Sequence, residues 1–369
     1  MAKVTGLEGV VAAETDIGLV DGERGHLIYR GYWAKDVAVH FSFEEAAHLL
    51  WYGELPDEGE LFRLKERLQA YRELPASLPP LLDAMPKSLP TMSVLQAAVA
   101  SLTEPDGTPA AWPPAPSQAE RLTALLPAII AYRYRRSKGL DPVQPHPELD
   151  HAANYLYMLT GTIPEPAHAK ALTAYLILGM EHGMNASTFS ARVTSSTQSD
   201  MYAAVSAAIG TMKGPLHGGA PSEVIAMLED IGTVERAEGW LRAVLEQGGR
   251  LMGFGHRIYK TKDPRAEALR TVTEKLTGDT DSFKLALHVE QTAIRLLEEY
   301  KPGRRLYTNV EFFAAAIMSA IQLPAELFTP TFTAARTVGW TAHVLEQAGV
   351  NRIFRPQSVY TGPMPTLGD

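Results

Sequence analysis

The chain carries Gly-Pro-Leu-His-Gly-Gly-Ala at residues 214–220 and Gly-Phe-Gly-His-Arg-Ile-Tyr-Lys-Thr-Lys-Asp-Pro-Arg at residues 253–265. Each stretch sets one histidine, His217 or His256, among glycines. Glycine lacks a side chain, so its backbone can approach a ligand closely and adopt positive φ. Either stretch alone is typical of an ordinary loop. Together with the charged residues described below, they indicate a binding site.

Composition limits the classes of protein to which the chain can belong. It has 369 residues, 46% hydrophobic and 21% charged, which is typical of a globular chain of roughly two domains. The formal charge of -8 argues against a general nucleic-acid binder. Cysteine is absent, which excludes disulfides, thiolate metal sites and a cysteine nucleophile. Residues 1–11 lack a leader pattern, and no apolar run approaches the ~18 residues that span a bilayer, so we expect a cytoplasmic protein without a membrane segment.

The pattern of apolar residues predicts a mainly α fold. Residues 6–32 alternate β-branched and polar residues around Asp21-Gly22, which predicts a short β-hairpin near the N-terminus. Ser42 and Glu45 form a capping-box pattern that opens a helix, and Gly53 ends it. Helical periodicity then predicts helices over residues 58–71, 93–102, 118–137, 149–160, 167–182, 221–231, 234–246, 265–276, 282–300, 310–321 and 330–348.

Known nucleotide and metal signatures are missing from the sequence. Gly253-Phe-Gly255 lacks the third glycine of a dinucleotide fingerprint, and no Gly-x-x-x-x-Gly-Lys-Ser/Thr pattern occurs. The 11 histidines form no His-Glu-x-x-His pattern. We therefore predict no metal site.

His217 precedes Pro221, a residue suited to the first turn of a helix. The positive end of a helix disfavours imidazolium, so His217 is expected to be neutral and to donate a hydrogen bond to an oxygen that gains negative charge. The alternative is a loop histidine bonded to backbone.

Arg336 lies inside a predicted helix, with Ala335 and Val338 among its apolar neighbours. A buried guanidinium requires an anion, either a structural carboxylate or a carboxylate of a ligand. Arg265 and Arg355 pose the same question. Three such arginines suit a substrate with two or three carboxylates.

With these residues assembled, the sequence resembles the citrate synthase family from Gly6 to Pro356. The matching segments are Glu-His-Gly-Met-Asn-Ala-Ser-Thr-Phe at 181–189, the two glycine stretches, and Asn-Val-Glu-Phe-Phe at 309–313. The resemblance implies a mainly helical homodimer with a large domain, residues 1–218 and 323–369, and a smaller mobile domain, residues 219–322.

The resemblance also implies roles for individual residues. His217 is similar to the histidine that donates to the acyl-CoA enolate, and His256 to the histidine that polarises the oxaloacetate carbonyl. Glu311 stands where the family usually has the catalytic aspartate. Its place at the start of a helix suggests that the helix dipole holds its carboxylate ionised, although it could equally serve as a cap.

Four further residues resemble the oxaloacetate ligands of the family. They are His182, Arg265, Arg336 and Arg355, the last supplied by the partner subunit. Separately, Lys260 and Lys262 lie beside His256, where they could attract CoA phosphates, although solvated lysines are the simpler interpretation.

The activity implied is condensation of an acyl-CoA with oxaloacetate followed by thioester hydrolysis, with acyl-CoA as co-substrate and no permanently bound cofactor. Acetyl-CoA would give citrate and propionyl-CoA would give 2-methylcitrate. A third alternative is a poorly catalytic paralogue with a binding or regulatory role, suggested by Glu311. The chain also departs from many members at Pro221-Ser222 and at Gln357.

Overall fold

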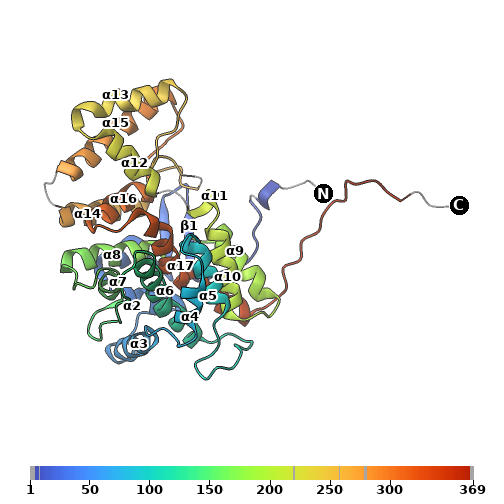
Figure 1. Cartoon of the computed structure of the whole chain (residues 1–369). Helices are drawn as coiled ribbons and strands as arrows, with labels where there is room; N and C mark the ends of the chain where they lie inside the picture. Colours follow the sequence, from blue (N-terminus) through green and yellow to red (C-terminus); the bar gives the residue numbers. More distant parts are fainter. Residues whose placement is uncertain (1–4, 8, 219–220, 257, 278–280, 366–369) are drawn as a thin grey trace.

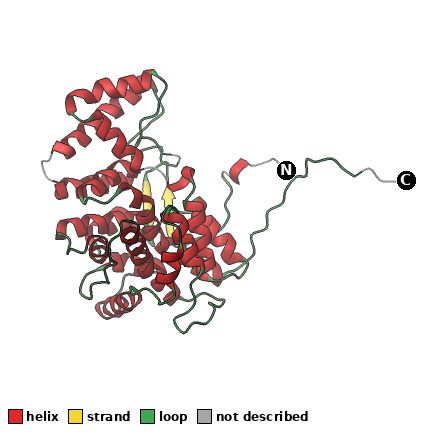
Figure 2. Ribbon diagram, viewed as in Figure 1, coloured by secondary structure: helices red, strands yellow, loops and turns green. Residues whose placement is uncertain are grey.

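A computed structural model describes residues 5–7, 9–218, 221–256, 258–277 and 281–365 (Figure 1). Gly219 and Ala220 of the first glycine stretch, and with them the predicted domain boundary, lie outside the described residues. Within the described part, 17 α-helices surround one small antiparallel sheet (Figure 2). The predicted mainly α fold is therefore confirmed. No helix in these ranges is both long and apolar enough to cross a membrane.

The predicted hairpin is present. Strand β1 (Gly18–Asp21) pairs with β2 (His26–Tyr29), and β2 pairs with β3 (Tyr32–Trp33). The turn between β1 and β2 packs tightly on a distant loop, because a Cβ at Gly22 would lie 2.2 Å from the carbonyl oxygen of Ile258. Only glycine fits this contact.

Most helices form one large body around α17 (Phe328–Gly349). This helix is almost wholly buried and packs on α2, α6, α8, α9 and α10. The body contains α1 (Ala34–His40), α2 (Phe43–Tyr52), α3 (Glu58–Tyr71), α4 (Leu78–Ala84), α5 (Thr91–Ala100), α6 (Pro116–Ser137), α7 (His151–Thr160), α8 (Pro166–Gly179), α9 (Ala186–Ser196), α10 (Met201–Met212), α11 (Pro215–Gly218) and the 3₁₀ turns Thr5–Leu7 and Ala325–Leu327.

A second group of helices lies at the other end of the molecule in Figure 1. It joins the body through α14 and α16, which pack on α8. Beyond Gly349 the chain has neither helix nor strand in the part that is described, and both terminal segments leave the body on the same side. The group comprises α12 (Pro221–Ile231), α13 (Val234–Glu246), α14 (Pro264–Thr277), α15 (Asp281–Tyr300) and α16 (Val310–Ala320).

Local sequence rules account for several helix boundaries. The Ser42–Glu45 capping box forms, with the Ser42 hydroxyl accepting from Glu45 N and the Glu45 carboxylate accepting from Ser42 N. Helix α12 begins at Pro221, as predicted. The prediction that one helix runs to His182 was wrong, since α8 ends at Gly179. Its last carbonyls accept hydrogen bonds from a side chain instead, as the Tyr29 hydroxyl donates to Ile177 O and Leu178 O.

Candidate active site

Two loops meet beside the first turn of α16. Phe254 and Thr308 form an isolated β-bridge that joins the second glycine stretch to the segment before α16. Gly253 has φ +84°, and a Cβ there would lie 2.8 Å from the Phe312 ring. The glycines therefore allow close backbone packing, and His256 leaves this loop next to the helix that carries Glu311.

His256 and His182 lie together with Tyr259 between the loop and the large body. The rings of His182 and His256 are 5.6 Å apart, and His182 Nε2 lies 3.1 Å from the Tyr259 hydroxyl. His256 Nδ1 accepts hydrogen bonds from the backbone N–H groups of Ile258 and Tyr259, so a neutral ring carries its proton on Nε2. Burial lowers the pKa of His256 to about 4 and that of His182 well below its usual range, with Arg265 adding to both effects. Both imidazoles are neutral at pH 7.

Arg265 is held by a carboxylate of its own chain. It is 5% exposed and donates from Nε and Nη2 to the two carboxylate oxygens of Asp263, at 3.0 and 2.8 Å. Asp263 also accepts from Arg265 N and from Val310 N at the head of α16. The guanidinium Nη2 lies 3.3 Å from His256 Nε2. Since both atoms carry protons, an oxygen between them would be shared by two donors.

Arg336 is buried without such a partner. It is 2% exposed, its Nε donates to Gly179 O at 2.6 Å, and the guanidinium stacks over Phe332. No carboxylate of the described residues lies within ion-pair distance of it, since the nearby Glu181 binds His343 Nε2 at 3.1 Å. Burial lowers the pKa of Arg336 from its ordinary value. Its charge also acts on the pKa of His182, His217 and Glu311, as expected for neighbours in one site.

Glu311 lies in the first turn of α16, and its N–H is capped by the Asn309 side chain. Burial raises the pKa of Glu311 to about 7, although the charges of Arg265 and Arg336 lower it. The expectation that the helix dipole keeps this carboxylate ionised was therefore wrong, because desolvation outweighs it. Asn309 supplies the cap, so Glu311 does not serve as one.

His217 lies in the short turn α11, where its Nε2 is 2.7 Å from the Ser187 hydroxyl oxygen. Burial lowers its pKa to about 4, followed by the charge of Arg336. The predicted neutral state is supported, but its main cause is burial. Ser187 also accepts from Trp340 Nε1 and lies 2.8 Å from Asn185 Oδ1, so its single proton can go to either Asn185 or His217.

The remaining predicted residues lie farther from this cluster. Lys262 lines two cavities beside α14 that do not contain His217, His256 or Glu311. Lys260 is exposed next to the site loop, and its N–H donates to Gly22 O. Arg355 is exposed on the C-terminal segment that leaves the body. The single chain therefore does not bring Arg355 to the site.

Sequence reasoning missed three residues of this arrangement. Tyr259 and Asp263 lie inside the quoted glycine stretch, and the Asp-Pro pair at a helix start was a usable signal for a capping carboxylate. Ser187 had no signal beyond its place after Asn185, which caps α9. Within the described residues, no three His, Asp or Glu side chains are grouped as a metal ion would require.

The chain is similar to proteins of known name over nearly its whole length. The sequence profile described as "Citrate synthase, C-terminal domain" matches residues 6–357. A citrate synthase of Synechocystis sp. is 41% identical over 362 residues, which cover 97% of this chain and 90% of that protein. A 2-methylcitrate synthase of Mycobacterium tuberculosis is 40% identical over 359 residues, with the same two coverages.

Solved structures show the same likeness. The crystal structure of citrate synthase from Pyrobaculum aerophilum is 39% identical and superposes with a TM-score of 0.88, covering 98% of this chain and 93% of that one. A ternary complex of carboxymethyl coenzyme A and oxaloacetate with citrate synthase from Thermoplasma acidophilum is 30% identical, with a TM-score of 0.85 and coverages of 98% and 96%.

Proposed function

The chain belongs to the citrate synthase family, and on this premise we propose that it condenses acetyl-CoA with oxaloacetate and hydrolyses the thioester to give citrate and CoA. The observation that carries the proposal is the pairing of one carboxyl, Glu311 with a pKa of about 7, with two imidazoles of pKa about 4. At neutral pH this supplies a base together with two uncharged hydrogen-bond donors, which is what proton removal next to a thioester requires.

Each step then has a residue. Glu311 takes a proton from the methyl carbon of acetyl-CoA, and His217 donates a hydrogen bond to the enolate oxygen that results. The enolate carbon attacks the ketone carbon of oxaloacetate, while His256 donates its Nε2–H hydrogen bond to the ketone oxygen as this becomes an alkoxide. The alkoxide takes up one proton to become a hydroxyl, which balances the proton that Glu311 removed from the methyl carbon. Water finally cleaves the thioester and releases CoA.

Oxaloacetate is held by cations and by His182. Arg336, which has no carboxylate partner in the described structure, takes one substrate carboxylate, and the Nη2 side of Arg265 faces the ketone oxygen beside His256. Lys260, next to the site loop, is the proposed contact for CoA phosphates, with Lys262 a weaker candidate because it lines cavities elsewhere.

Ser187 acts as a positioning residue for His217. When the Ser187 hydroxyl donates to His217 Nε2, the neutral ring carries its proton on Nδ1 and can donate from there. Trp340 donates to the same hydroxyl oxygen at 3.0 Å, which helps to fix its orientation. This arrangement supports the donor role assigned to His217.

The test is an assay of CoA release that requires both oxaloacetate and an acyl-CoA. CoA release that occurs only when both oxaloacetate and the acyl-CoA are present supports condensation. Tight oxaloacetate binding without CoA release identifies a poorly catalytic paralogue. Propionyl-CoA is the second candidate substrate, because the 2-methylcitrate synthase relative is as similar as the citrate synthases. One methylene changes kcat/KM by only about 10- to 200-fold, so both acyl-CoAs must be compared directly.

We also propose a homodimer in which Arg355 completes the site of the other subunit, and closure of residues 219–322 onto the large domain when oxaloacetate binds. Proposed ligand residues come from both the large body and the second group of helices, which supports closure, and the projecting C-terminal segment supports the exchange of Arg355. Mixed dimers of inactive Arg355→Ala and His256→Ala subunits should recover activity, and persistent inactivity would rule out a shared site. We propose that the enzyme acts in the cytoplasm.

A further inference from the structure

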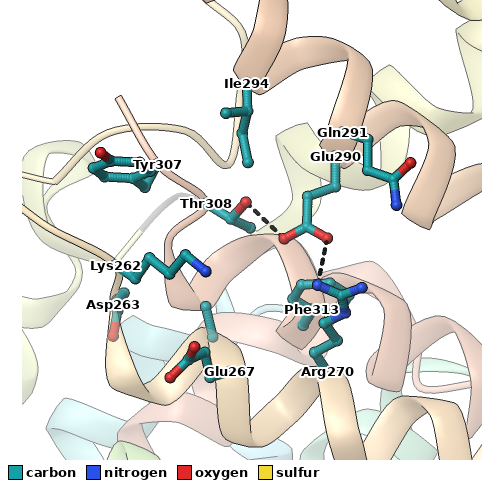
Figure 3. Close-up of a pocket in the computed structure, with 11 residues that line it drawn as sticks. Lys262, Asp263, Glu267, Arg270, Glu290, Gln291, Ile294, Tyr307, Thr308 and Phe313 are labelled. Atoms are coloured by element: carbon teal, nitrogen blue, oxygen red, sulfur yellow. Dashed lines mark hydrogen bonds and ion pairs between the residues drawn. The ribbon is translucent and has the colours of Figure 1, made fainter. Parts of the chain in front are cut away.

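A pocket lies between α14, α15 and the segment that leads into α16 (Figure 3). It has a volume of about 130 Å³, enough for several waters or a small organic molecule. Its apolar lining residues are Ala266, Ile294 and Phe313, and the other side chains that line it are polar or carry charges of both signs. None of the proposed catalytic residues lines it.

Glu290 provides an incompletely satisfied charge at this pocket. It is 7% exposed, and its Oε1 accepts from the Thr308 hydroxyl at 2.8 Å. Its Oε2 is buried without a hydrogen bond and has only Arg270 Nη1 at 3.5 Å as an ion-pair partner. A buried carboxylate oxygen normally accepts hydrogen bonds, and this one has an ion pair with Arg270 but no hydrogen bond within the described residues.

Lys262 provides the opposite charge. Figure 3 shows Lys262 and Glu290 entering the pocket from different sides. Lys262 has no ion-pair partner within the described residues, and Arg270 adds a second cation next to Glu290. The pocket therefore offers a carboxylate for an ammonium group, cations for a carboxylate, and the apolar side chains of Ile294 and Phe313 for a short aliphatic group.

We propose that this pocket binds a small aliphatic α-amino acid, with its ammonium on Glu290, its carboxylate on Lys262 and Arg270, and its side chain on Ile294 and Phe313. Lys262 and Arg270 are exposed and solvated, so the buried carboxylate of Glu290 is the group that most needs a partner. A zwitterion supplies a hydrogen-bond donor to Glu290 and a carboxylate to the two cations, whereas a simple anion leaves Glu290 Oε2 without a donor.

The pocket is joined to the site through Asp263, which lines it. The same carboxylate holds Arg265 and accepts from Val310 N at the head of α16. An occupant that fixes Lys262 therefore also fixes Asp263 in the position that orients Arg265. We expect it to tighten oxaloacetate binding by at least about fivefold, the lower end of typical coupling between two sites. This second statement rests on the proposed function, whereas amino-acid binding does not.

The test is titration calorimetry of the full-length protein with L-valine and with two analogues of valine that each lack one of its charged groups. Isovalerate lacks the ammonium and isobutylamine lacks the carboxylate, and both keep the aliphatic group. Valine should bind in the millimolar range, and isovalerate and isobutylamine should each bind at least tenfold more weakly. If either analogue binds as tightly as valine, the pocket is a simple ion site. If valine gives no heat of binding, the pocket holds only water. Either result overturns the proposal.

Variants locate the binding. Glu290→Gln keeps the acceptor for Thr308 and removes the charge, so valine affinity should fall at least tenfold. Glu274→Gln makes the same charge change on the outer face of α14 and should bind like wild type. Ile294→Phe fills the pocket from α15 without altering a charge, which keeps the test open if Glu290→Gln does not fold. Wild-type valine affinity in Ile294→Phe would place valine elsewhere.

The coupled measurement uses the oxaloacetate dissociation constant with and without valine. An unchanged constant would overturn the link through Asp263 and leave the binding site intact. A protein that binds valine but not oxaloacetate would instead contradict the proposed function, so the two failures are distinguishable.

Discussion

The two walls of the active site hold their arginines in opposite ways. In the wall made by the loop at 253–265 and by α16, Arg265 has a carboxylate on two of its nitrogens, and Asp263 in turn holds the head of α16. In the wall made by α8 and α17, Arg336 is equally buried but binds one backbone carbonyl. Burial lowers the pKa of both guanidiniums, and for Arg265 the charge of Asp263 and its neighbours reverses that effect.

The contrast between the two arginines distinguishes a structural role from a role in substrate binding. The charge of Arg265 is already neutralised by the fold, so its main effect is to order the loop and orient His256. The charge of Arg336 is left for an incoming anion, since a buried cation without a counterion destabilises the protein until one arrives. Stability and substrate affinity should therefore respond differently to changes in the two walls.

The largest expected effect is on turnover in Glu311→Gln. The variant keeps the shape of the side chain and removes the base, so kcat should fall by about 10²- to 10⁴-fold while oxaloacetate affinity stays near normal. Because the folded-state pKa of Glu311 is raised, its ionisation destabilises the fold as pH rises from 4.5 through about 7. The variant should thus be no less stable than wild type at pH 8. Near wild-type turnover would assign the proton to another group.

The second largest expected effect is the loss of stability in Asp263→Asn. This variant removes the carboxylate that holds Arg265 in the loop at 253–265. The substitution leaves Arg265 buried without its carboxylate and should lower the free energy of unfolding by about 3–5 kcal/mol. Urea unfolding measures this value directly. If Arg336→Gln is destabilised as strongly in the same experiment, the proposed difference between the walls is wrong.

The Arg336→Gln variant sharpens the comparison from the other side. It should raise the oxaloacetate dissociation constant by an amount equivalent to about 2–5 kcal/mol, since a substrate carboxylate loses its buried cation. Its own stability should change little, because removal of an uncompensated buried cation offsets the loss of the hydrogen bond to Gly179 O. Calorimetric titration of oxaloacetate gives the affinity, and an affinity within a fewfold of wild type would remove Arg336 from the binding site.

The smallest effect is on pH dependence. Glu311 must be ionised to accept a proton, so kcat/KM should fall by about tenfold per pH unit below pH 7 and level off above it. His217 and His256 have pKa values near 4 and stay neutral through this range. A single ionisation should fit the pH profile of kcat/KM between pH 5 and 8. If the residual activity of Glu311→Gln shows no such ionisation, the decrease at low pH belongs to Glu311.

Sequence patterns predicted the elements whose signals are local. The Ser42–Glu45 box, Pro221 and the hairpin at Asp21-Gly22 depend on neighbours in the chain, and each lies where it was expected. No helix was predicted for residues 186–212, yet α9 and α10 form there. Each helix buries one face, but the buried residues of α9 are mostly serine, threonine and arginine, so they give no hydrophobic period. In α10, alanines occupy both the buried and the partly exposed positions, which hides the face.

The features of the site also fall into those that local sequence predicts and those that depend on tertiary structure. Its histidines and arginines could be found from glycine context and resemblance, but their electrostatics could not. The raised pKa of Glu311 and the free guanidinium of Arg336 depend on burial and on carboxylates far away in sequence. The partner of His217, Ser187, is 30 residues distant and carries no pattern of its own.

The contact of Gly22 with Ile258 has a consequence for biosynthesis. A ribosome releases the hairpin early, but the loop that its turn packs against emerges roughly 240 residues later, which at about 5–20 residues per second means a delay on the order of ten seconds or more. The N–H of Asp16, just before β1, donates to Glu346 on the last helix, so this contact forms later still. The hairpin turn of the nascent chain therefore stays unpacked through most of translation, even though Tyr29 of β2 can bind the end of α8 as soon as residue 181 has emerged.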